Sequence, residues 1–105
     1  MPIVIEFTGR YAAPKIVCDY CGKVITAAKD GNYQWSHAAG MDVGQTAPMY
    51  FTHKACCHAF EQAHGGSSGA WGAIELEALP AFLATNLHIP WRQATARARQ
   101  MSLRS

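Results

Sequence analysis

The chain has 105 residues, of which 50% are hydrophobic and 15% charged, with a formal net charge of +2. This length suits a single domain, and the apolar fraction excludes a chain that is disordered throughout. No apolar run approaches the roughly 20 residues that cross a bilayer, and the first ten residues lack a signal-peptide pattern. We therefore expect a cytoplasmic protein with no membrane partner.

Residues 3–7 alternate in the way that predicts a strand with one well-buried face. The side chains on that face would be Ile3, Ile5 and Phe7. Residues 8–14 contain glycine and proline and predict a loop. Residues 24–28 and 33–36 predict a hairpin, because the Asp30-Gly31 pair between them is a strong turn signal.

Small and polar residues with two glycines and a proline predict a long loop at residues 38–48. A short aromatic strand follows at residues 49–52. The segment from His53 to His64 has no helix breaker and predicts a helix. The Gly/Ser-rich residues 65–70 then predict a linker.

Residues 71–77 show a second strand pattern, and a helix with proline in its first turn follows. The apolar stripe of that helix consists of Leu79, Phe82, Leu83 and Leu87. Pro90 ends it, and residues 91–102 predict a last helix. Because such a stripe must be buried, we expect it to pack on the rest of the chain or to form a homodimer.

Positive charge collects in the last helix. Residues 1–64 carry five basic and five acidic side chains, and no acid follows Glu77. The arginines beyond it are Arg92, Arg97, Arg99 and Arg104. Arg92, Arg97 and Arg99 form the candidate surface for phosphates or an acidic protein, and an ordinary solvated helical face is the alternative.

The strongest motif is Cys18-x2-Cys21 followed, after 31 intervening residues, by His53-x2-Cys56. Four Cys and His ligands satisfy a tetrahedral structural zinc, and the chain has no methionine cluster that would favour copper. Gly22 can adopt the positive φ that a turn between two converging cysteines often needs. The spacing therefore predicts one zinc ion.

The sequence CDYCG, a hairpin, and FTHKAC opening a helix resembles treble-clef zinc fingers, most closely a single LIM-type finger. The resemblance covers about residues 15–64 and implies one structural zinc on the matching positions Cys18, Cys21, His53 and Cys56. Two departures are a longer gap between the ligand pairs and the lack of a second finger. The predicted fold is α+β: a finger at residues 1–64, the linker, and a strand with two helices at 71–105.

The adjacent cysteines leave the fourth ligand open. Cys56 shares a helical face with three apolar residues, Ala59, Phe60 and Ala63. This inward face favours Cys56 as the ligand. Cys57 lies four residues after His53, however, so these two side chains would also converge.

Other roles for the cysteines remain as alternatives. One alternative is four buried thiols without a metal. Another is a redox dithiol at Cys18 and Cys21, although such a pair is typical of a helix N-terminus beside a βαβ unit and a hairpin is predicted here. A thiol enzyme using Cys57 is a further alternative, whereas a disulfide does not suit a reducing compartment. Four protein ligands would leave a zinc ion no open position for catalysis. We therefore expect a non-enzymatic zinc module that binds a protein or nucleic acid as an accessory or regulatory factor.

Overall fold

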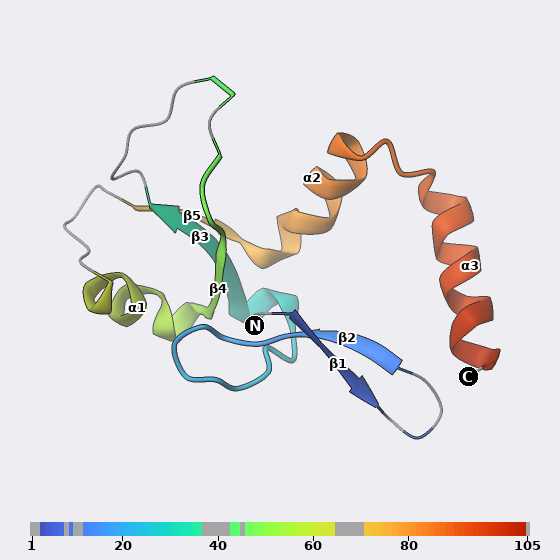
Figure 1. The fold of residues 1–105 in the computed structure, drawn as a ribbon, viewed down its shortest axis with the longest axis horizontal. Coiled ribbons are helices and arrows are strands. Elements are labelled where there is room, and N and C mark those ends of the chain that lie inside the picture. Colours follow the sequence, from blue (N-terminus) through green and yellow to red (C-terminus); the bar gives the residue numbers. More distant parts are fainter. Residues whose placement is uncertain are drawn as a thin grey trace.

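The structure is a computed structural model that describes residues 3–7, 9, 12–36, 43–44, 46–64 and 71–104, without the side chains of 101–104. It is a small α+β fold (Figure 1). With η marking a 3-10 turn, its elements are β1 (Ile3–Phe7), β2 (Ala12–Ile16), η1 (Ala28–Asp30), β3 (Gly31–Ser36), β4 (Tyr50–His53), η2 (Lys54–Cys56), α1 (Cys57–Ala63), β5 (Trp71–Glu75), η3 (Leu76–Ala78), α2 (Leu79–Asn86) and α3 (Trp91–Arg104).

The strands form two antiparallel sheets. One is the β1–β2 hairpin, and the other has three strands in the order β4-β3-β5. Because β5 pairs with β3, the segment after the predicted linker belongs to the same sheet as the segment before it. None of the described helices could span a bilayer.

The two faces of the three-stranded sheet carry different side chains, because successive residues of a strand point to opposite sides. Tyr33 lies beside Phe51 and Ile74 in the register, on the face that packs against the Cys18 segment. Gln34 and Thr52 belong to the other face, which packs against α1. The sheet is thus the middle layer, with the turn at residues 18–23 (the cysteine turn) on one side and α1 on the other.

Most of the buried apolar side chains lie on the face toward the cysteine turn. They are Cys18, Ile25, Tyr33, Phe51 and Leu76. On the α1 face, Phe60 is 1% exposed and its ring contacts Tyr50, His64 and Trp71. The sheet is therefore held between two small apolar clusters, one on each of its sides.

A buried polar chain crosses from the sheet to α1. The Thr52 hydroxyl donates to Gln34 Oε1 at 2.6 Å, and Gln34 Nε2 donates to the Glu61 carboxylate at 3.3 Å. Gln34 and Thr52 are completely buried, and each has its hydrogen-bond partner. Pairing of this kind is what allows polar side chains to lie inside a fold.

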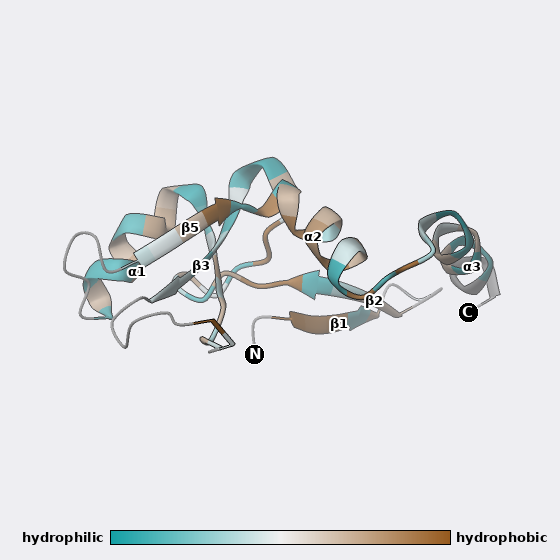
Figure 2. Cartoon of the chain, turned by 90° about the horizontal axis from the view of Figure 1, so that it is seen from above, coloured by the Kyte–Doolittle hydropathy of each residue, from teal (hydrophilic) through white to brown (hydrophobic). Residues whose placement is uncertain are grey.

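The strand at residues 3–7 is confirmed as β1, but its well-buried face is wrong. Ile3, Ile5 and Phe7 are all exposed, Phe7 to 81%. The predicted loop at 8–14 is also wrong from Ala12 onward, because β2 begins there and pairs with β1. A two-stranded sheet has no interior strand, so Pro14 disrupts no further pairing. Figure 2 shows β1 as a largely hydrophobic strand at the edge of the molecule.

The predicted hairpin around Asp30-Gly31 is wrong as well. Ala28–Asp30 form the turn η1, and β3 pairs with β4 and β5 instead of with residues 24–28. Residues 24 and 25 are held elsewhere: Val24 bridges Val17, and the Ile25 N–H donates to the Ile16 carbonyl at 2.8 Å. Backbone groups of Val24 and Ile25 that the predicted hairpin would pair with β3 are therefore bonded to the segment before Cys18 instead.

The remaining predicted elements agree with the structure in type. β4 and β5 cover most of their predicted segments, and Pro80 lies in the first turn of α2. The helix predicted from His53 begins as η2 and becomes α-helical at Cys57. The linker at residues 65–70 and most of the loop at 38–48 lie outside the described residues.

The molecule is elongated, and α3 stands at one end (Figure 1). Its radius of gyration is 15.8 Å and its longest extent is 47 Å. A compact domain of this length has a radius of gyration of about 13 Å. Of the side chains described in residues 91–100, Ala94 alone is half-buried. Helix α3 is therefore presented to solvent on nearly all sides.

Candidate metal centre

The turn that carries the first two cysteines is closed by its own backbone. The Gly22 N–H donates to the Cys18 carbonyl at 3.0 Å, and the Cys18 N–H donates to the Lys23 carbonyl at 2.9 Å. Gly22 has a φ of 76°, which confirms the predicted left-handed conformation. This tight turn directs the side chains of Cys18 and Cys21 to the same side of the backbone.

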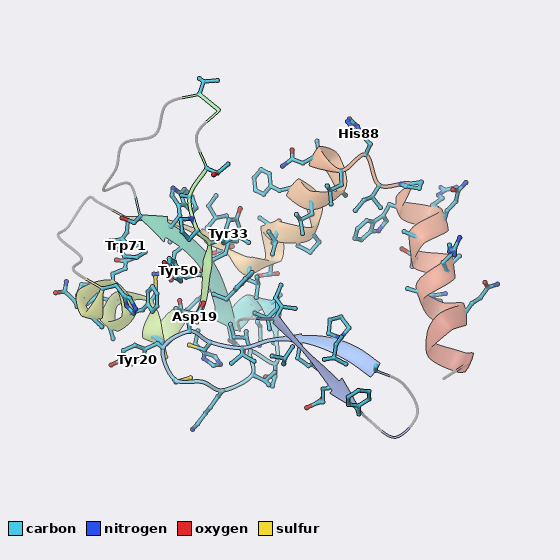
Figure 3. The ribbon with its side chains drawn as sticks, in the orientation of Figure 1. Asp19, Tyr20, Tyr33, Tyr50, Trp71 and His88 are labelled. Carbon is cyan, nitrogen blue, oxygen red and sulfur yellow. The ribbon has the colours of Figure 1, made fainter. Side chains whose placement is uncertain are left out.

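Asp19 ties this turn to β4. Its backbone N–H donates to the Phe51 carbonyl at 2.7 Å, and its carboxylate accepts from the Phe51 N–H at 2.8 Å. Phe51 lies two residues before His53, so both ligand pairs are fixed relative to each other through this contact. Figure 3 shows the sulfur atoms beside the turn that carries Asp19 and Tyr20. Sequence patterns gave no sign of the role of Asp19, because its partners are backbone atoms 32 residues away.

The structure brings together the four side chains selected from the sequence. One ligand atom from each of Cys18, Cys21, His53 and Cys56 lies within 4.8 Å of the other three. The Cys21 Sγ is 3.4 Å from the His53 Nδ1. Cys18 is buried, Cys21 is exposed, and the other two are half-buried. Three sulfurs and one imidazole at this separation fit the tetrahedral donor set of a zinc ion.

The Cys18 sulfur is surrounded by N–H donors. Burial by itself raises the pKa of this thiol, but the backbone N–H groups of Cys21, His53 and Tyr20, with the His53 side chain, lower the pKa to about 6. The three N···S distances are between 3.4 and 3.5 Å. Hydrogen bonds to the charged form favour it, so the backbone prepares Cys18 as a thiolate.

Cys56 shows the opposite effect. Burial, followed by the nearby sulfurs of Cys18 and Cys21, raises its pKa to about 11. Without a cation, the fold therefore gathers thiols that cannot all ionise at neutral pH. A divalent ion reverses this balance, because it stabilises every thiolate that coordinates it. The cluster is thus better suited to holding a metal ion than to remaining empty.

The choice between the adjacent cysteines falls on Cys56. Cys56 belongs to the four-residue cluster, whereas the Cys57 sulfur lies 3.6 Å from the Glu61 carboxylate on the α1 face of the sheet. The predicted helical face that Cys56 would share with Phe60 is wrong, however. Cys56 lies in η2, before the α-helix, and packs with Cys18, while Phe60 packs in the separate aromatic cluster.

The candidate partner residues are not part of this centre. Arg92, Arg97 and Arg99 lie on α3, which stands apart from the cysteine turn (Figure 1).

No protein family, curated protein or solved structure matches this chain.

Metal binding should weaken as the pH falls. Cys56 has a pKa of about 11 in the metal-free fold, so it is protonated at neutral pH and must release a proton to coordinate zinc. Between about pH 6 and pH 8 we expect at least a tenfold loss of zinc affinity for each unit of pH. Below pH 6 the loss should become steeper, because Cys18, with a pKa of about 6, then binds a proton as well. Chelator competition at several pH values measures this slope, and a value well below one would contradict the role of Cys56.

Replacing Asp19 with alanine should also weaken metal binding. The substitution removes the carboxylate that accepts from the Phe51 N–H and loosens the turn against β4. A hydrogen bond to a charged group contributes about 1.5 kcal/mol, which corresponds to roughly tenfold in zinc affinity. The matched control is Asp30→Ala, an exposed acid in η1, which should change the affinity less than about twofold. Equal effects of the two substitutions would show that Asp19 has no positioning role.

Proposed function

We propose that this chain is a non-enzymatic structural-zinc module of the treble-clef type, acting in the cytoplasm as an accessory or regulatory factor that binds a protein or nucleic acid. The zinc ion would hold the cysteine turn, β4 and η2 together. The three-stranded sheet, through β5, would then support α2 and α3 as the surfaces that meet the partner.

One observation carries this proposal: three thiols and one imidazole converge within 4.8 Å, with one sulfur already favoured as a thiolate. Four protein ligands complete a tetrahedral coordination sphere, which is typical of structural sites. A catalytic zinc keeps one position for water or substrate. The donor set therefore favours a scaffold over a reaction centre.

The alternative is a thiol or redox enzyme that uses Cys18 with Cys21, or Cys57. Burial raises the pKa of Cys57, and the nearby Glu61 carboxylate raises it as well. A thiol that stays protonated is a weak nucleophile, so this environment does not favour Cys57. Cys18 has the low pKa of a reactive thiol, but its sulfur is buried among backbone donors.

A thiol-protection experiment separates the two functions. Native mass spectrometry of the purified chain should show one zinc ion. A thiol reagent should modify only Cys57, and slowly because its raised pKa keeps the thiol protonated, while the three ligand cysteines stay protected. Chelation should expose all four thiols. The redox alternative predicts instead that Cys18 and Cys21 react in the zinc-loaded protein, or that the protein reduces disulfides of a test substrate such as insulin.

A second copy of the chain is a candidate protein partner, favoured by apolar side chains on α2. Phe82, Leu83 and Leu87 are 49%, 43% and 65% exposed, whereas Leu79 packs against the core of its own chain. Homodimerisation would therefore use the first three and not Leu79.

The free edge of β1 is also self-complementary, because antiparallel pairing about Ile5 sets Ile3 against Phe7 and Glu6 against Val4.

Sedimentation velocity of the zinc-loaded protein tests this partner. A dimer should become a monomer in the Leu83→Ser variant, and His88→Ser, an exposed substitution beyond the end of α2, should leave it unchanged. A wild-type chain that sediments as a monomer at high concentration would contradict self-association.

A further inference from the structure

The described side chains of helix α3, at residues 91–100, are mostly exposed, so they bury little of the surface that usually keeps a helix folded. Its 14 residues span about 21 Å, and most of its described side chains are exposed. An isolated helix of this length is only marginally stable in water. Much of the helix is coloured as hydrophilic (Figure 2), so burial of an apolar face against the chain does not explain it. A helix with this composition is best explained by a partner that it contacts directly.

The positive charge of α3 indicates the sign of the charge that the partner carries. Arg92, Arg97 and Arg99 are exposed, and no acidic residue occurs after Glu77. Within the described part of the chain, the two ion pairs join Lys15 to Glu6 and Lys54 to Glu75, and neither includes an arginine. The positive charge of the helix is therefore uncompensated, and the complementary partner is an anion.

The arginines lie on two sides of the helix rather than in one stripe. Seven residues correspond to nearly two turns, so Arg92 and Arg99 lie within about 20° of each other, and Arg97 lies about 140° around the axis. Gln93 and Gln100 fall between these two positions. The half-buried Ala94 lies about 60° beyond Arg97, on the side of the helix away from Arg92 and Arg99.

This arrangement matches what a helix needs in the major groove of DNA. The groove is about 12 Å wide and accepts an α-helix, and a central glutamine can form two hydrogen bonds with adenine. Arginines on both flanks can reach phosphates of the two strands. A-form RNA has a deep and narrow major groove that side chains cannot read, so duplex DNA fits better.

A shallow hollow of about 330 Å³ supports this fit. It runs along one flank of α3 and is lined by Trp91, Arg92, Thr95, Ala96 and Arg99. Its lining combines two arginines with the smaller side chains of Thr95 and Ala96, so a phosphate and its sugar have room beside positive charge.

We propose that α3 binds the major groove of duplex DNA, with Arg92, Arg99 and Arg97 on the phosphates and Gln93 and Gln100 facing the base edges. The inference rests on the proposed function, because it makes nucleic acid the partner of the zinc-built scaffold. The exposed position of α3, its uncompensated charge and its two-sided arginines carry the inference together.

Fluorescence anisotropy with a labelled duplex of about two helical turns tests the proposal on the zinc-loaded chain. Affinity should fall steeply between about 50 and 200 mM salt. The Arg92→Gln/Arg99→Gln variant should bind about tenfold or more weakly, with a logarithmic salt slope shallower by about 1.8. The charge-matched control Lys23→Gln/Lys29→Gln, which alters two exposed lysines away from α3, should bind within about twofold of the wild type.

Selection from a pool of random duplexes tests whether Gln93 and Gln100 contact base edges. The wild type should prefer the selected duplex over a scrambled one by about tenfold, and Gln93→Ala/Gln100→Ala should remove this preference without changing the salt slope. Retention of the preference would overturn the role of the glutamines.

The zinc content of the same samples keeps the two proposals distinguishable. A zinc-loaded, folded chain that binds no duplex, or loses as much affinity in the lysine control, overturns the DNA inference and leaves the zinc module standing. Equal binding of polyglutamate would also overturn it, in favour of an acidic protein partner. A chain that binds no zinc would instead contradict the proposed function.

Discussion

Replacing Cys18 with serine is expected to prevent metal binding and to unfold the sheet and the turns that surround the candidate metal centre. Cys18 is 1% exposed, receives three backbone N–H groups and lies at the centre of the core that includes Tyr33 and Phe51. Binding of a structural zinc contributes about 10–16 kcal/mol, which is comparable to the whole stability of a small domain. Elemental analysis and circular dichroism should show a metal-free chain with little ordered structure.

The matched control is Cys57→Ser on the other side of the sheet. Its sulfur faces Glu61 and is outside the four-residue cluster, so this variant should keep one zinc ion and the wild-type spectrum. Zinc retained by the Cys18 variant, or lost by the Cys57 variant, would contradict the assignment of the centre. The adjacent ligand variant Cys56→Ser should behave like Cys18→Ser.

Replacing Phe60 with alanine is expected to lower the stability of the zinc-loaded protein by about 3–5 kcal/mol. The side chain is 1% exposed and contacts three other rings, at centroid distances of 4.0 Å to His64, 5.1 Å to Tyr50 and 5.7 Å to Trp71. Its removal would leave a cavity between α1 and the sheet. Denaturant titration of the zinc-loaded protein measures the change.

Val43→Ala provides the control for this experiment. Val43 is fully exposed, so the substitution should change stability by less than about 0.5 kcal/mol. If Phe60→Ala fails to fold, Phe60→Leu should give a smaller loss of the same sign, because leucine refills part of the cavity. A Phe60→Ala variant as stable as the control would show that the aromatic cluster does not support the sheet.

The cysteine turn shows how far sequence reasoning reaches. The ligand types, their spacing and the need for Gly22 are local properties, and they led to the four side chains that the structure brings within 4.8 Å. The contact between Asp19 and Phe51 that positions the two pairs was missed, since a carboxylate bonded to a distant backbone has no sequence pattern.

Two of the three errors in the strands have a common cause. Asp30-Gly31 is a good hairpin signal, but Val24 and Ile25 were already paired with the segment before Cys18. The alternation in residues 3–7 predicts a strand correctly, yet it cannot show whether another layer covers that strand. Segments that are far apart in the sequence compete to pair with a strand, and they also decide whether a face of that strand is buried.

The sequence by itself determined the local features of this protein: the metal-ligand spacing, most helices and strands, and the acid-free stretch after Glu77. Only the tertiary structure decided which strands pair, that Cys56 rather than Cys57 joins the cluster, and that α3 stands exposed. The reason is physical. Composition and periodicity describe a few neighbouring residues. Hydrogen-bond partners and buried faces depend instead on which distant segment of the chain packs against a strand or helix.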